Sequence, residues 1–258
     1  MTSTDVTVPD WADLLTSWDA QQTGYLPNRE GRFTAMLDVL DGLLPDDFVA
    51  VDLACGPGSL SRRLLDRFPN ARCVAVDLDP VLVELGRRTS EEYGDRLRWV
   101  EADVGAPELL DALGVEQADA VLSSTALHWL PADRLTALYT RLGTLVRPGG
   151  VFLDADNIPY AGGRHALQVL AETRRAGHAM AAFGEDMASG FRDWFVAASA
   201  RPELAAALGE REKRFADLGR EHAEPSVEMH LAALRYAGFE LADVVWQEFD
   251  DRIIAAVR

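Results

Sequence analysis

Residues 48–156 alternate between short apolar runs and amphipathic helical patterns, and this rhythm constrains the fold more than any other feature. We predict five buried strands, at 48–54, 72–78, 97–102, 118–124 and 151–155. Strands that are apolar on both faces and separated by helices belong to parallel sheets covered on both sides. The pattern therefore predicts an α/β fold built on a doubly wound, mostly parallel sheet.

The C-terminal residues follow a different pattern. A predicted helix over 227–237 ends at Gly238, and two further strand-like runs occupy 239–247 and 252–257. The connection between these two runs is too short for a crossover helix, so they should pair antiparallel as a hairpin at the edge of the sheet. The complete sheet then has seven strands.

Two segments lack strand signals. Residues 1–45 read as an N-terminal helical cover, with Trp11, Leu14, Leu15 and Trp18 on one face. Residues 158–225 are Ala-rich and helical, which predicts a helical cap inserted after the fifth strand, over an acceptor site. The Rossmann-like core is then formed by 46–157 and 226–258.

Charge and composition exclude several classes of protein. The 258 residues carry 25 Lys+Arg against 42 Asp+Glu, a formal net charge of −17. Such a charge opposes binding to nucleic acid or to an anionic membrane. Lys213 is the only lysine, so the Gly-Lys-Ser/Thr phosphate-binding loop is absent. The chain shows no secretory signal pattern and no apolar run of about 18 residues, and its two cysteines are isolated. We therefore expect a cytoplasmic protein.

Small residues and carboxylates gather where the predicted strands end. The segment 52–58 reads Asp-Leu-Ala-Cys-Gly-Pro-Gly and follows the first strand, where open α/β sheets bind ligands. Asp77 ends the second strand, placed to hold ribose hydroxyls, and Asp103 follows the third, placed for an adenine amino group. Asp52 would repel a pyrophosphate but attract a cationic or amine-bearing ligand.

These motifs resemble those of the class I S-adenosylmethionine-dependent methyltransferases. The matching segments are 52–58, 76–79, 101–104, 123–125 and 146–150, together with the closing hairpin. The segment 126–130, Ala-Leu-His-Trp-Leu, is similar to that of small-molecule members such as the trans-aconitate methyltransferase group. The family usually has Gly where this chain has Ala54, a small change that narrows the loop.

The resemblance implies a set of cofactor-binding residues for S-adenosylmethionine and its product S-adenosylhomocysteine. It places Asp77 at the ribose diol, Leu78 against the adenine, Asp103 and Val104 at the adenine edge, Ala54, Gly56 and Gly58 along the methionine part, Asp52 beside that part, and Ser123 near the methyl group. An N-terminal arginine often clamps the methionine carboxylate, and in the segment 25–32, which begins with Tyr25, Arg29 and Arg32 are candidates. We favour Arg32.

The expected reaction is in-line methyl transfer to a small-molecule acceptor. His128 would lie at the mouth of the acceptor pocket and could take a proton from a hydroxyl or amine, or it could be a packing residue. Asp156 and Asn157 occupy positions used by metal-dependent relatives, but Ser123 and Ser124 stand where those relatives need an Asp, so we expect no metal. We expect Asp156 and Asn157 to contact the acceptor or to cap a helix instead.

Two other functions stay open. A nicotinamide-dependent oxidoreductase would want Gly in place of Ser61 and no carboxylate at Asp52. A non-catalytic S-adenosylmethionine-binding protein would have the same cofactor site. The sequence leaves the acceptor and the oligomeric state undetermined.

Overall fold

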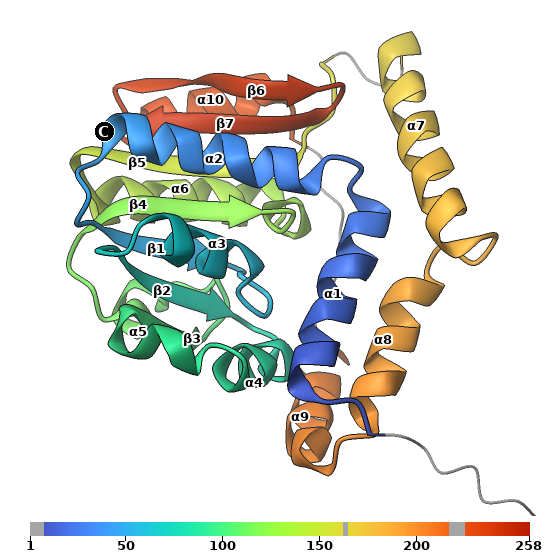
Figure 1. Cartoon of the computed structure of the whole chain (residues 1–258). Coiled ribbons are helices and arrows are strands. Elements are labelled where there is room, and N and C mark those ends of the chain that lie inside the picture. The colour runs from blue at the N-terminus through green and yellow to red at the C-terminus, as the bar shows by residue number, and fades with distance from the viewer. Residues whose placement is uncertain (1–7, 162–164, 217–224) are drawn as a thin grey trace, which may run out of the picture.

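The computed structural model describes residues 8–161, 165–216 and 225–258, which form a sheet with helices packed around it (Figure 1). In chain order the elements are α1 (Trp11–Tyr25), α2 (Arg29–Leu43), β1 (Val49–Leu53), α3 (Ser59–Arg67), β2 (Arg72–Asp77), α4 (Pro80–Arg88), η1 (Glu91–Arg96), β3 (Leu97–Glu101), α5 (Leu109–Leu113), β4 (Ala118–Ser124), η2 (Leu127–Trp129), α6 (Ala132–Leu145), β5 (Val146–Asn157), α7 (Ala166–Phe183), α8 (Ser189–Ser199), η3 (Pro202–Leu204), α9 (Ala205–Ala216), α10 (Val227–Tyr236), β6 (Leu241–Glu248) and β7 (Asp251–Val257). The elements labelled η are short 3-10 helices.

The seven strands lie in the order β3-β2-β1-β4-β5-β7-β6. Strands β1 to β5 run parallel, whereas β7 is antiparallel to both β5 and β6. The predicted fold class, a mostly parallel seven-stranded sheet with an antiparallel C-terminal hairpin, is confirmed. The chain order reverses between β1 and β4, and at such a switch point the connecting loops diverge and leave a crevice at the carboxyl ends of the strands.

The fifth strand begins earlier than the sequence predicts. We expected residues 147–150 (Arg-Pro-Gly-Gly) to separate helix from strand, but β5 starts at Val146. Val146 pairs with Ala118 and Val151 with Ala120, with a register shift between them. This irregularity accommodates Pro148, which has no N–H to donate to the ladder, and Gly149, whose φ is +75°.

Helices cover both faces of the sheet, as the apolar strands require. One face packs against α2 and α3, with Met36, Leu40 and Leu64 fully buried there. The other face packs against α5, α6 and α10, around Leu138 and Leu234. Burial of such side chains, at about 25 cal/mol per Å², is the main stabilising contribution to this core.

A third apolar cluster joins α1 to helices that lie between β5 and α10 in the sequence. Leu14 and Trp18 of α1 pack with Leu82 of α4 and Trp194 of α8. The rings of Trp18 and Trp194 meet edge-on, with centroids 5.0 Å apart. The apolar face predicted for the first helix is thus buried.

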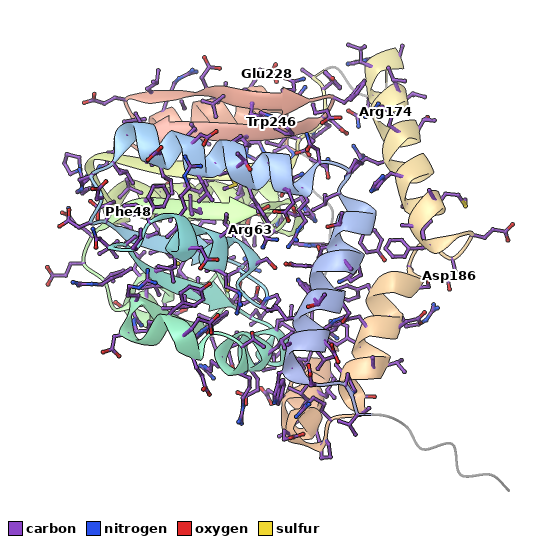
Figure 2. All side chains as sticks on the ribbon, viewed as in Figure 1. Phe48, Arg63, Arg174, Asp186, Glu228 and Trp246 are labelled. Carbon is purple, nitrogen blue, oxygen red and sulfur yellow. The ribbon has the colours of Figure 1, made fainter. Side chains whose placement is uncertain are left out.

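Helices α7, α8 and α9 form the described part of the segment predicted as a cap, of which 162–164 and 217–224 lie outside the described residues. Arg174 on α7 reaches Glu248 at the end of β6, at 3.0 Å, and Asp186 lies at the turn between α7 and α8 (Figure 2). No helix in the described ranges has the length and apolar character needed to cross a membrane.

Candidate functional site

A cavity of about 640 Å³ opens at the carboxyl ends of β1 to β4, the edge predicted to bind a ligand. Its walls include nine of the predicted site residues: Tyr25, Asp52, Ala54, Gly56, Asp77, Leu78, Asp103, Val104 and His128. Three of the predicted residues, Arg32, Gly58 and Ser123, are not in its wall. The parallel strands bring Asp52, Asp77 and Asp103 to the same cavity because these strands all end at one edge of the sheet.

The loop after β1 turns sharply, using left-handed backbone conformations. Ala54, Gly56 and Gly58 have φ values of 53°, 58° and 82°. Glycine adopts these angles without strain, which explains why glycine suits position 54 better than alanine does. Gly58 lies behind the cavity wall: a Cβ there would come within 2.7 Å of the Trp99 ring, so its role is to allow α3 to pack closely.

Asp77 ties the end of β2 to this loop. Its Oδ2 accepts the Gly56 N–H at 2.7 Å, and its Oδ1 accepts the Asp79 N–H at 2.8 Å. Burial raises the pKa of Asp77 to about 6, even though these N–H groups favour the charged form. The carboxylate is held in one orientation at the cavity wall, where hydroxyl donors of a ligand would stabilise its charge.

Asp52 is a second buried carboxyl group in the same wall. The Ser61 hydroxyl donates to its Oδ2 at 2.6 Å, and burial raises its pKa to about 7. A cationic ligand group would lower this pKa and bind the ionised form. This environment matches the expectation that Asp52 faces an amine-bearing ligand.

Asp103 is partly exposed and already has two partners. The Gly105 N–H donates to its Oδ1 at 2.8 Å, and Nη2 of Arg134 lies 2.6 Å from its Oδ2. Arg134 also lines the cavity, and the sequence pattern did not single it out. A carboxylate oxygen has two acceptor sites, so Asp103 can accept a further N–H without losing Arg134.

Of the two candidate arginines on α2, Arg29 lies in the cavity wall, whereas we favoured Arg32. Arg32 is fully buried away from the cavity, where it donates to Thr125 Oγ1 at 2.6 Å and pairs with Asp251 at 2.6 Å. Arg29 pairs with Asp19 on α1 at 2.9 Å. The two arginines stand three residues apart on α2, and the sequence alone could not tell which one faces the sheet and which one faces the cavity.

At the end of β4, the cavity wall is formed by residues next to Ser123 and not by Ser123 itself. The Ser123 hydroxyl is buried and donates to the carbonyl of Leu53 at 3.2 Å, so it faces the neighbouring strand. Ser124 and Thr125 line the cavity instead. Thr125 has a φ of 59°, and its N–H donates to the carbonyl of Ala155 at 2.8 Å. The cavity wall at the end of β4 is therefore formed one or two residues after Ser123.

His128 is oriented by a carboxylate that the sequence analysis considered only in other roles. Its Nδ1 lies 2.8 Å from Oδ1 and 2.9 Å from Oδ2 of Asp156, and its backbone N–H donates to the same group at 3.2 Å. Burial opposes ionisation of Asp156, but His128 and Arg32 outweigh it, so the pKa of Asp156 lies below its usual range. An ionised Asp156 holds the proton of the neutral ring on Nδ1 and leaves Nε2 as the basic nitrogen.

Asp154, two residues earlier on β5, is fully buried beneath the site. Burial and the nearby Asp156 raise its pKa well above the usual range. Across the described residues, no group of three or more His, Cys, Asp and Glu side chains is arranged to hold a metal ion.

Several wall residues come from segments that the sequence marks only as apolar or charged helix. Trp18 was expected in the core, and it is buried, but it also lines the cavity. Ala188, Phe191, Arg211 and Phe215 reach the cavity from the segment after β5. Phe191 thus lines the cavity, whereas Trp194 of the same helix is packed in the third cluster. No local pattern distinguishes these two roles.

Comparison with known proteins finds that part of this chain is similar to methyltransferases. The family model described as "Methyltransferase domain" matches residues 50–150. A trans-aconitate 2-methyltransferase of Azoarcus sp. (strain BH72) is 33% identical over 138 residues, which cover 53% of this chain and 49% of that protein. A ribosomal RNA small subunit methyltransferase H of Kineococcus radiotolerans is 36% identical over 114 residues, covering 42% and 29%. The chain thus spans about half or less of the length of these relatives.

Among solved structures, magnesium protoporphyrin IX methyltransferase from Synechocystis PCC 6803, with bound S-adenosylhomocysteine, has the same fold. The TM-score is 0.58, with 17% sequence identity, over 95% of this chain and 94% of that one. The likeness extends over nearly the whole of both chains. At this identity it establishes the fold, and the matched segment 50–150 contains the loop, Asp52, Asp77, Asp103 and His128.

Proposed function

We propose that this chain is a class I S-adenosylmethionine-dependent methyltransferase that methylates a hydroxyl or amine of a small, largely uncharged acceptor. The observation that carries the proposal is the His128–Asp156 pair, which stands in the wall of the same cavity as Asp52 and Asp77. A methyl donor site alone would not need a base oriented in this way.

The donor set of the cavity fits S-adenosylmethionine. Asp77 offers a fixed acceptor for ribose hydroxyls, Asp103 retains acceptor capacity for an amino group, and Asp52 suits an ammonium group. Arg29 provides a cation in the wall, and its pairing with Asp19 uses one of five N–H donors of the guanidinium. When bound, S-adenosylmethionine supplies an electrophilic methyl group on a sulfonium.

The residues of this chain would contribute positioning and proton transfer. Holding the acceptor in line with the methyl group is the larger contribution, because it removes the entropic cost of bringing two molecules together. His128 would accept the proton of the nucleophile on Nε2, a role typically worth about 10²–10⁴-fold in rate. Asp156 would hold the ring in the required tautomer and stabilise the imidazolium that forms.

The charges of the cavity favour an acceptor without several carboxylates. The arginines of the described lining are Arg29, Arg134 and Arg211, and they lie 2.9 Å, 2.6 Å and 2.6 Å from the carboxylates of Asp19, Asp103 and Asp79. A polycarboxylate such as trans-aconitate would enter a cavity whose arginines are already paired with carboxylates of the protein. The proposed acceptor therefore differs from the one named for the Azoarcus relative.

A small acceptor also agrees better with the charge of the chain than an RNA does. A formal charge of −17 repels a phosphate backbone, and RNA recognition relies on cations that neutralise phosphates. The cavity volume of about 640 Å³ lies in the range of small-molecule sites, which are mostly apolar with a few placed polar groups.

The test is S-adenosylhomocysteine formation by the purified chain with S-adenosylmethionine and three acceptor panels: phenols and alcohols, amines, and polycarboxylates including trans-aconitate. We expect turnover in the first or second panel and none above background in the third. Turnover of trans-aconitate alone would contradict the proposed acceptor class. Binding of the cofactor with no turnover in any panel would favour a non-catalytic binder.

A further inference from the structure

Helix α9 contributes Arg211 and Phe215 to the cavity wall, although it lies far along the sequence from the methyltransferase motifs. It packs beside α4, which begins directly after β2 (Figure 1). No side chain of α9 is fully buried, and its apolar packing is limited to partly buried residues such as Ala207 and Leu208 against the third cluster. Its contacts with the strand ends of the sheet are ionic and polar.

Two arginines of α9 hold the segment that follows Asp77. Nε of Arg211 lies 2.6 Å from Oδ2 of Asp79, a buried residue that also accepts the Val81 N–H and so begins α4. Arg214 donates to the carbonyl of Leu78 at 3.1 Å and pairs with Glu101, at the end of β3, at 2.6 Å. Both arginines contact the segment after β2, and Arg214 also contacts the end of β3; these are the two strands at whose ends lie the carboxylates expected to hold the nucleoside.

The guanidinium of Arg211 is also surrounded by aromatic rings. It lies 3.9 Å from the ring centroid of Phe195, 4.7 Å from that of Phe215 and 5.9 Å from that of Phe191. Arg211, Phe191 and Phe215 line the same cavity as Asp77 and Leu78. Stacking on aromatic rings therefore adds to the ion pair with Asp79 in orienting this guanidinium.

We propose that α9 forms the outer wall of the adenosine end of the cofactor site, with Arg211 as a positioning residue that keeps Phe215 and the segment 77–79 in place. The proposal rests on the proposed function and adds cofactor binding to the role of a helix expected to cover the acceptor. A planar heteroaromatic ring packs well against an aromatic ring or a guanidinium, and both occur here beside Asp77. Dissociation of the cofactor would then depend on these ion pairs.

The experiment measures the dissociation rate of S-adenosylhomocysteine, and the affinity of 5′-deoxy-5′-methylthioadenosine, which lacks the amino acid part. The variants are Arg211→Met, Arg214→Gln, Arg211→Lys and Phe215→Ala. The control is Arg192→Gln, because Arg192 on the neighbouring helix α8 forms an exposed pair with Asp186. Phe215 is only half-buried on the surface helix, so this variant should fold even where Arg211→Met does not.

We expect Arg211→Met and Phe215→Ala to bind both ligands roughly fivefold to thirtyfold more weakly, mainly through faster dissociation, with Arg211→Lys in between and Arg192→Gln unchanged. Added salt should speed dissociation from the wild type more than from Arg211→Met, because salt screens the Arg211–Asp79 pair. Equal losses for both ligands would locate the effect at the nucleoside.

If the wild type binds S-adenosylhomocysteine and folded Arg211→Met and Phe215→Ala bind it with unchanged rates, the proposal for α9 is wrong while the proposed function stands. A loss for S-adenosylhomocysteine but not for the nucleoside would also overturn it. If the wild type binds neither ligand, the proposed function itself fails.

Discussion

The imidazole of His128 and the carboxylate of Asp156 face each other across the ends of β4 and β5, with Nδ1 at 2.8 Å from Oδ1. His128 lies on η2, which follows β4, and Asp156 lies near the end of β5; the two strands pair in parallel, with Ser124 opposite Ala155. The strand register therefore brings together two residues separated by 28 positions. An acidic partner on Nδ1 fixes the tautomer that a general base needs.

We predict that His128→Asn and Asp156→Asn both lower turnover on the order of 10²–10⁴-fold, while S-adenosylhomocysteine affinity changes by no more than a few fold. Asn at 128 restores shape without basicity. Asn at 156 can donate to Nδ1, which favours a proton on Nε2 and removes the base. Single-turnover kinetics and calorimetry separate the two effects.

His178→Asn is the matched control, because His178 lies on α7 and contacts the carbonyl of Thr23 outside the cavity wall. It should retain full turnover. If both His128→Asn and Asp156→Asn keep most of their activity, proton transfer by this pair is refuted, and an acceptor that is already ionised, such as a carboxylate, becomes the better interpretation.

Cofactor affinity should rise with pH between about 5 and 7.5. Burial raises the pKa of Asp52 to about 7 and of Asp77 to about 6, so the ligand-free protein holds protons there at pH 5. Hydroxyl and ammonium groups bind the ionised carboxylates, and binding should release protons in this window. Calorimetry in buffers of different ionisation enthalpy measures that release, and Asp52→Asn should reduce it.

Asp52 and Asp77 should lower the stability of the ligand-free fold as pH rises, whereas they raise the affinity for the cofactor. A carboxyl group whose folded pKa lies above its unfolded value contributes stability at low pH, and this contribution is lost as pH rises through about 6 to 7. The melting-temperature increase caused by S-adenosylhomocysteine should therefore grow from pH 5 to pH 8. A ligand effect that is flat or shrinks over this range would contradict the assignment of Asp52 and Asp77.

Ala54→Gly should stabilise the ligand-free protein. Ala54 has a φ of 53°, where an alanine is strained by roughly 1–2 kcal/mol and a glycine is not, although glycine gains entropy in the unfolded chain. We expect a net increase of roughly 1–3 °C in melting temperature. Ala137→Gly, at an exposed position inside α6, should do the reverse and cost about 1 kcal/mol. Equal destabilisation by both variants would show that the loop is not strained.

Arg32→Met should destabilise the fold by about 3–5 kcal/mol, because it leaves Asp251 buried without its cation and removes the bond to Thr125. Arg67→Met is the control, since Arg67 makes exposed pairs with Asp38 and Asp41 and should cost about 1 kcal/mol or less. Urea unfolding compares the two. Similar costs for both variants would mean that Arg32 does not neutralise the buried carboxylates.

The sequence predicted what depends on periodicity and strand ends. The five parallel strands, the hairpin and the loop at 52–58 follow from local patterns, and Asp52, Asp77 and Asp103 meet because parallel strands end at one edge. These predictions needed no knowledge of side-chain packing.

The sequence could not resolve choices made by tertiary packing. Arg29 and Arg32 differ only in which side of α2 they occupy. The buried partner of Arg32 is Asp251, which lies near the other end of the sequence. Asp156 could be a cap, an acceptor contact or a metal ligand until its distance to His128 was known. The cavity role of Arg211 depends on the path of three helices after β5, which no local signal specifies.

The most direct test of the account is calorimetric titration of S-adenosylhomocysteine into the purified chain, its Asp77→Asn variant and an Asp111→Asn control at an exposed site on α5. The account predicts one binding site in the wild type and the control, no binding of NAD, and affinity lower by about 1.5–3 kcal/mol, roughly 10- to 150-fold, in folded Asp77→Asn. Absence of binding, or equal binding by wild type and Asp77→Asn, would contradict it.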